Sequence, residues 1–241
     1  MKRLASISIL GLCAALSPSA SAAPATGPMA ELKSSNERID HLLKQKGKRD
    51  EVKARQDMKD IVNGFLDYDE LAKRSLSQHW DVITRPQRDD FVATLKELIE
   101  KNYVKQLRTN LEYEVAYKNE SVTEGDATVS TVVKVRTKGK STDTGIDYKM
   151  KQKGAKWMVY DVITDDVSMV KNYRSQFNKI ITNESFDALV KKMKKRAAEI
   201  DETKADGGKP GDLDDKKSTA SVAKDPDKKP VAGGKKAVGA K

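Results

Sequence analysis

The chain has 241 residues, of which 37% are hydrophobic and 34% are charged, and its formal net charge is +10. This composition is too polar for an integral membrane protein and too apolar for a chain that is disordered throughout. One cysteine, Cys13, and two histidines exclude a disulfide framework within the chain and a zinc site built from Cys and His side chains.

Residues 1–22 have the pattern of a secretory signal peptide. Lys2 and Arg3 precede an apolar stretch that is too short to span a bilayer. Ala20-Ser21-Ala22 then offers small residues for cleavage before Ala23. No second apolar run of about 18 residues follows, so we expect the cleaved protein to be released across a membrane and not anchored in it.

Residues 201–241 are rich in Lys, Asp, Gly, Pro and Ala and contain no aromatic residue. Such a segment buries too little apolar surface to offset an ordering cost of about 1–2 kcal/mol per residue. We therefore expect a disordered tail, acting as a spacer or as a loose tether to anionic surfaces. The remaining residues, 23–200, are expected to form a single domain.

Apolar residues recur with helical spacing in the first half of this domain. The pattern predicts helices over residues 29–44, 49–65, 67–80 and 84–107. Asp67 or Asp69 is available as a cap for the third helix, and Thr84 for the fourth.

The apolar period then changes to alternation, which predicts strands near residues 112–118, 129–136, 144–151 and 157–162. Trp157, Val159 and Asp161 are expected on one side of the last strand. Two further helices are expected, one after Ser168 and one after Glu184. These elements predict an α+β fold in which helices pack on one face of a twisted four-stranded antiparallel sheet.

The sequence contains no recognisable catalytic constellation. His79 is expected to be structural or exposed. Asp161 is a candidate general base if it is buried, and the alternative is an ion pair with Arg174. The sequence therefore disfavours an enzymatic function. A small enzyme that uses Asp161 as its base and a secreted protein-interaction or chaperone module both remain alternatives.

The segments WMVYDV (residues 157–162) and NYRSQF (172–177) resemble the signature of the MlaC-type family of periplasmic phospholipid carriers, also called toluene-tolerance proteins. The segments LDYDELA (66–72) and QRDDF (87–91) agree with this resemblance, which covers about residues 30–197. The chain departs from the family at Asp166, where Gly is usual, and at Arg85-Pro86.

The resemblance implies a soluble monomeric periplasmic carrier that has no catalytic residue, cofactor or metal and binds no nucleic acid. It implies an NTF2-like or cystatin-like fold with a lipid pocket between sheet and helices. The implied partners are a phospholipid, an inner-membrane ABC transporter with a lipid-binding ring and an outer-membrane lipoprotein complex. The carrier would move the phospholipid between the two complexes and so maintain the lipid asymmetry of the outer membrane.

Apolar faces that are expected to meet between the two layers supply the candidate lipid-binding residues. The alternative for each of them is ordinary core packing, because a sheet-facing stripe looks the same with or without a ligand. The candidates are Leu95, Leu98, Ile99, Tyr103, Val129, Val133, Ile146, Tyr148, Trp157, Val159, Val170, Tyr173 and Phe177.

Overall fold

The computed structural model describes residues 27–45, 50–106, 112–137 and 140–200. The expected signal peptide and tail lie outside these residues. None of the helices within them is long and apolar enough to cross a membrane.

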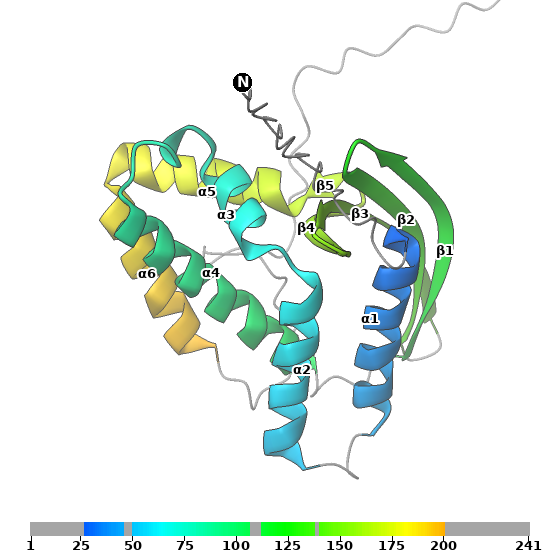
Figure 1. The fold of residues 1–241 in the computed structure, drawn as a ribbon. Coiled ribbons are helices and arrows are strands. Elements are labelled where there is room, and N and C mark those ends of the chain that lie inside the picture. The colour runs from blue at the N-terminus through cyan, green and yellow to red at the C-terminus, as the bar shows by residue number, and fades with distance from the viewer. Residues whose placement is uncertain (1–26, 46–49, 107–111, 138–139, 201–241) are drawn as a thin grey trace, which may run out of the picture.

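Within the described residues, four α-helices precede the sheet and two follow it, as the apolar spacing predicts (Figure 1). Side-chain caps define several of their starts: Asp50 accepts hydrogen bonds from two amides of α2, and Asp67, Ser168 and Ser185 each accept one at the starts of α3, α5 and α6. The bounds are α1 Pro28–Lys44, α2 Glu51–Phe65, α3 Tyr68–Leu76 with the 3-10 turn η1 Ser77–His79, α4 Arg85–Gln106, α5 Met169–Asn183 and α6 Phe186–Glu199.

The strands form one antiparallel sheet with the order β1-β2-β3-β4-β5. Their bounds are β1 Glu112–Thr123, β2 Asp126–Thr137, β3 Lys140–Lys153, β4 Lys156–Thr164 and β5 Val167–Ser168. The predicted α+β fold is confirmed, and the structure adds the two-residue β5 to the four expected strands.

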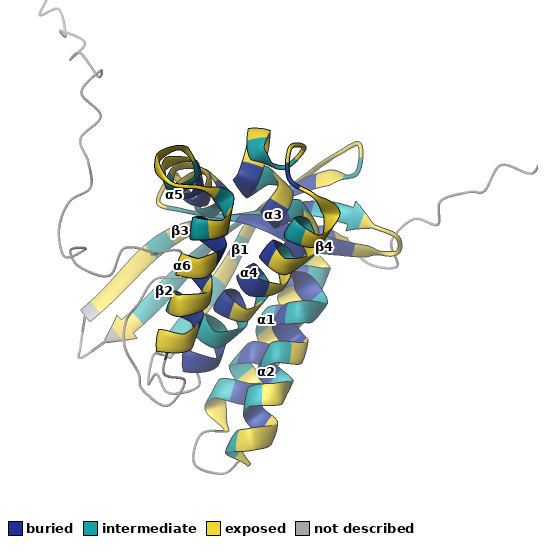
Figure 2. Cartoon of the chain, turned by 90° about the vertical axis from the view of Figure 1, so that its left-hand side faces the viewer, coloured by how far each residue is buried: buried dark blue, intermediate teal, exposed yellow. Residues whose placement is uncertain are grey.

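The core lies between the sheet and a helical layer centred on α4, which packs against α2, α3 and α6 (Figure 2). Phe91 of α4 and Phe177 of α5 are fully buried, and their rings meet edge to face with centroids 5.4 Å apart. Such aromatic pairs stabilise the fold by about 0.5–1.5 kcal/mol beyond the effect of the area that they bury. This contact joins α4 to α5 within the helical layer.

The register of β4 shows that one expectation was wrong. Val159 pairs with Met150, but Asp161 pairs with the next residue, Lys149, so Tyr160 is an extra residue in a bulge. Because the bulge shifts the alternation, Asp161 lies on the opposite side of the sheet from Trp157 and Val159. Val162, opposite Tyr148, takes the inward side instead.

The turn between β4 and β5 carries backbone strain. Asp165 and Asp166 both have positive φ, 48° and 65°, a region in which L-residues are disfavoured and glycine is not. We expect Asp166→Gly to raise the free energy of unfolding by about 0.5–1 kcal/mol and Asp166→Ala to lower it, measured by urea denaturation. A fall in stability for the glycine variant would contradict this origin of strain.

Candidate functional site

Eleven of the thirteen predicted lipid-binding residues belong to the hydrophobic core between the helices and the sheet or pack against it, and Val133 and Ile146 do not. Most of them are buried in a single hydrophobic core. The buried members are Leu95, Leu98, Ile99, Val129, Trp157, Val159, Val170, Tyr173 and Phe177. Tyr103, Val133, Ile146 and Tyr148 are half-buried. Of these four, Tyr103 and Tyr148 pack against the core, and Val133 and Ile146 lie outside it.

Burial along the inward face of the sheet changes from one end to the other. At the end near Ala127 and Met150 the face is sealed, with side chains 4% and 0% exposed. Tyr148, opposite Val129, is half-buried, Thr131 beyond it is still buried, and the inward residues Val133, Val135 and Ile146 are half-buried. The helical layer therefore leaves one end of an apolar surface only partly covered.

The same uncovered end includes inward residues of β1 that the sequence reasoning did not select. Tyr113 and Val115 pair with Val135 and Val133 and are half-buried. We name the half-buried hydrophobic side chains of this face that do not pack against the core the open face: Tyr113, Val115, Val133, Val135 and Ile146. The alternation of residues 113–117 was the sequence signal for the two β1 members.

Helix α1 borders the open face. Its Asn36 donates a hydrogen bond from Nδ2 to the Tyr117 hydroxyl at 3.0 Å. Burial raises the pKa of Tyr113 to about 12, and the nearby carboxylate of Asp40 on α1 adds to the rise. Asp40, which is ion-paired with Lys44 on α1, therefore lies near the Tyr113 end of the open face.

Deeper in the interior, burial raises the pKa of three tyrosines that belong to the predicted set. The pKa of Tyr103 rises to about 12. For Tyr148 and Tyr173, burial is again the main cause of the raised pKa, and the Tyr103 hydroxyl raises both further. The hydroxyls of α4, α5 and β3 are thus close enough to influence one another.

These shifts predict how the protein responds to alkali. All seven tyrosines of the chain have a pKa raised above its ordinary value of about 10. Their contribution to stability is therefore complete below about pH 10 and is lost as the pH rises from there through the native pKa values. Each deeply buried tyrosine removes up to about 1.4 kcal/mol of unfolding free energy per pH unit in that window.

We expect tyrosinate absorbance in the near ultraviolet to rise only together with the loss of circular dichroism, above about pH 11. Several tyrosines that ionise near pH 10 in the folded protein would contradict this expectation.

Asp161 is buried and fully occupied in fixing α5. Its carboxylate accepts a hydrogen bond from the Ser168 hydroxyl at 2.6 Å and another from the Val170 amide at 2.9 Å. Ser168 in turn accepts one from the Lys171 amide at 3.0 Å. A carboxylate bound in this way caps the first turn of a helix. Because both oxygens of Asp161 accept these hydrogen bonds, the geometry does not favour a role as a general base.

Arg174 does not pair with Asp161, so that alternative was wrong. Its guanidinium donates from Nε and Nη2 to the backbone oxygen of Arg74, at 3.1 and 2.9 Å. It thereby satisfies a carbonyl in the last turn of α3. His79, close to the same point, contacts Asn178 of α5 at 2.9 Å, which agrees with its expected structural role.

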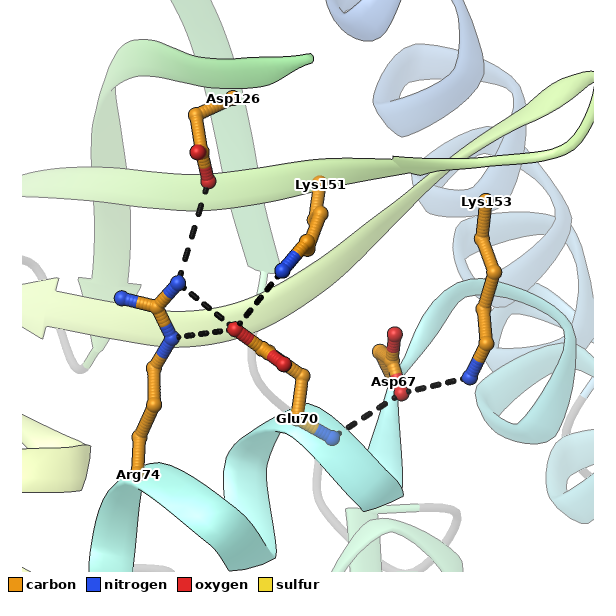
Figure 3. Close-up of polar contacts among 6 residues, drawn as sticks. All are labelled: Asp67, Glu70, Arg74, Asp126, Lys151 and Lys153. Atoms are coloured by element: carbon orange, nitrogen blue, oxygen red, sulfur yellow. Dashed lines mark hydrogen bonds and ion pairs between the residues drawn. The ribbon is translucent and has the colours of Figure 1, made fainter. Parts of the chain in front are cut away.

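A charged cluster on the other side of α3 holds this helix against the sheet (Figure 3). Glu70 receives Arg74 and Lys151 at 2.7 and 3.1 Å, and Lys153 reaches the helix cap Asp67 at 2.9 Å. Burial raises the pKa of Glu70, but its hydrogen bonds from Arg74 and Lys151 outweigh that effect and lower the pKa below its usual value. The cluster thus ties α3 to β3 through paired charges.

Two surface recesses are lined mostly by polar and charged side chains and contain none of the predicted residues. One, of about 600 Å³, lies between α1 and α2, and the other, of about 210 Å³, lies beside the charged cluster. Among the residues that the structure describes, no group of three His, Cys, Asp or Glu side chains is arranged to hold a metal ion.

Comparisons with known proteins agree with this architecture. A family model described as MlaC protein matches residues 33–195. A solved structure of a phospholipid-binding protein from Ralstonia solanacearum, in complex with a phospholipid, is similar with a TM-score of 0.60 and 20% sequence identity. The similarity covers 73% of this chain and 99% of that one. A comparison with curated proteins found no match.

Proposed function

The chain belongs to the MlaC family, and from this premise we propose that it binds a phospholipid and carries it between membranes. The observation that carries the proposal is the open face, a group of hydrophobic side chains on β1, β2 and β3 that the helical layer leaves half-buried. Each acyl CH₂ group moved from water to such a surface gains about 0.8 kcal/mol. The acyl chains would lie between the open face, α4 and α1.

The solved relative supports the proposal in a second way. It shares the fold over nearly its whole length and holds a phospholipid in its structure. In this chain the corresponding fold presents apolar residues from both layers to one interior. A carrier of this kind needs no nucleophile and no cofactor, and the occupied carboxylate of Asp161 favours no enzymatic role.

The proposed place of action is the periplasm, after removal of residues 1–22. There the carrier would receive lipid at an outer-membrane lipoprotein complex or at an inner-membrane ABC transporter and deliver it to the other, maintaining outer-membrane lipid asymmetry. Because the bound chains must leave again, docking would uncover the open face, and the transporter would supply the energy.

A vesicle exchange assay tests the proposal. Donor vesicles contain fluorescent phosphatidylethanolamine with a quencher, acceptor vesicles contain neither, and the delipidated protein is added at increasing concentration. We expect the transfer rate to rise in proportion to the protein concentration. Transfer no faster than spontaneous exchange would contradict the carrier function.

A further inference from the structure

The charges of the described residues are divided unevenly between two parts of the fold. Residues 169–199, which form α5 and α6, contain eight Lys and Arg residues and three Asp and Glu residues, a net charge of +5. The rest of the described chain contains 21 Lys and Arg residues and 25 Asp and Glu residues, a net charge of −4. These two helices are therefore the cationic part of a domain that is otherwise slightly acidic.

The outer side of α6 presents half of these cations to solvent (Figure 2). Leu189, Val190 and Met193 turn the other side of the helix into the core. Four exposed lysines remain on the solvent side, and we name them the lysine face: Lys191, Lys192, Lys194 and Lys195.

Nearby carboxylates neutralise the lysine face only in part. Three of its lysines each pair with one carboxylate, with Nζ–O distances of 2.8 Å for Lys194 and 3.6 Å for Lys195. All six side chains of these pairs are at least 40% exposed, and such ion pairs contribute only about 0–1 kcal/mol. Within the described residues, Lys191 has no ion-pair partner. The face can therefore exchange or add anionic partners at little cost.

The chain that follows α6 has the opposite charge. Asp201 comes directly after Ile200, whose amide donates a hydrogen bond to the Arg196 carbonyl at 3.2 Å and closes the helix. Residues 201–215 contain six Asp and Glu residues and two Lys residues. Residues 216–241 contain eight Lys residues and two Asp residues. The acidic part of the tail is thus the part that adjoins the lysine face in the sequence.

The length of this acidic part is sufficient for it to reach the whole lysine face. Helix α6 has 14 residues and is therefore about 21 Å long. Fifteen residues of extended chain span up to about 50 Å, and attachment to the helix end gives them an effective concentration on the order of millimolar. We propose that residues 201–215 turn back along α6 and cover the lysine face, screening it from other anionic partners.

Attraction between opposite charges of this kind needs no ordered contact. Residues 201–215 contain Leu213 as their only large apolar side chain, so we expect them to stay disordered while they are attracted to α6. An anionic membrane also fits the lysine face, but the protein meets it only from solution, whereas the tail is covalently attached. A membrane or an acidic protein would have to displace the tail first.

Paramagnetic broadening in NMR spectra of the mature full chain tests the proposal. Cys13 lies in the expected signal peptide, so Leu213→Cys supplies a single site for a nitroxide label within the acidic segment. Spectra are recorded at about 0.01 M and 1 M salt, where the Debye length is about 30 Å and 3 Å. We expect the amide signals of Lys191 and Lys192 to lose about half or more of their intensity at low salt and to recover it at high salt.

Two controls separate charge attraction from the effect of a short tether. Ala237→Cys places the label in the basic end of the tail, and we expect no salt-dependent broadening from it. In the chain labelled at position 213, Lys191→Gln with Lys195→Gln should remove about half or more of the salt-dependent broadening. Lys118→Gln with Lys156→Gln removes two exposed lysines of the sheet and should leave the broadening unchanged.

Broadening that is the same at both salt concentrations would show that the segment lies near α6 only because it is attached there, and would overturn the proposal. Absence of broadening at both concentrations would also overturn it and would leave the lysine face free for an anionic membrane or protein. Because no step of the test uses lipid, its outcome is independent of the proposed function.

Discussion

Val133→Trp is expected to lower the amount of phospholipid recovered with the protein by about 5- to 150-fold. Val133 lies in the middle of the open face, half-buried, with Val115 opposite it on β1 and Thr144 opposite it on β3. An indole there occupies space that the acyl chains would fill. Overpacking a site costs about 1–3 kcal/mol, which corresponds to that range of affinity.

The adjacent residue on the same strand provides the control. Val132 points to the opposite side of the sheet and lies between Ala116 and Gly145, where added side-chain atoms meet open space at the glycine. Val132→Trp should therefore leave lipid recovery unchanged. Ile146→Trp and Val133→Asp test the same surface by volume and by charge. Variants that fold and carry lipid normally would show that the open face is not the binding surface.

Asp161→Ala is expected to lower the free energy of unfolding by about 2–4 kcal/mol. The substitution leaves the Ser168 hydroxyl and the Val170 amide without their acceptor in a buried position. It also removes a negative charge from the start of α5, where the helix dipole favours one. Urea denaturation followed by circular dichroism measures the change.

Ser185→Ala is the comparison variant for this prediction. Ser185 caps α6 through a single hydrogen bond from the Ala188 amide and lies on the surface. Its loss should cost about 1 kcal/mol. If Asp161→Ala costs no more than Ser185→Ala, Asp161 does not anchor α5 to the sheet as described.

The sequence was sufficient to predict the helix boundaries to within a few residues because their signals are local, whereas β1, β2 and β3 extend beyond the predicted strands. Asp67, Thr84 and Ser168 are helix caps whose hydrogen bonds reach only three residues along the chain. The turns at Gly125 and Gly154 adopt positive φ, which glycine allows. Such features depend on neighbours in the sequence and not on the tertiary fold.

The errors came from interactions that no local pattern reports. The bulge at Tyr160 reverses the side on which Asp161 lies, and alternation alone assumes an unbroken strand. The carbonyl of Arg74 that binds Arg174 is 100 residues away, and a backbone acceptor has no sequence signature. Likewise, burial of Val159 and half-exposure of Val133 depend on how far the helical layer extends over the sheet.

Native mass spectrometry of the mature protein, purified from a periplasmic extract, tests the central claim most directly. The account predicts a population heavier by one diacyl phospholipid per chain, which is released only on denaturation and is identified after organic extraction. A clean lipid-free mass that persists after incubation with phospholipid vesicles would contradict the account.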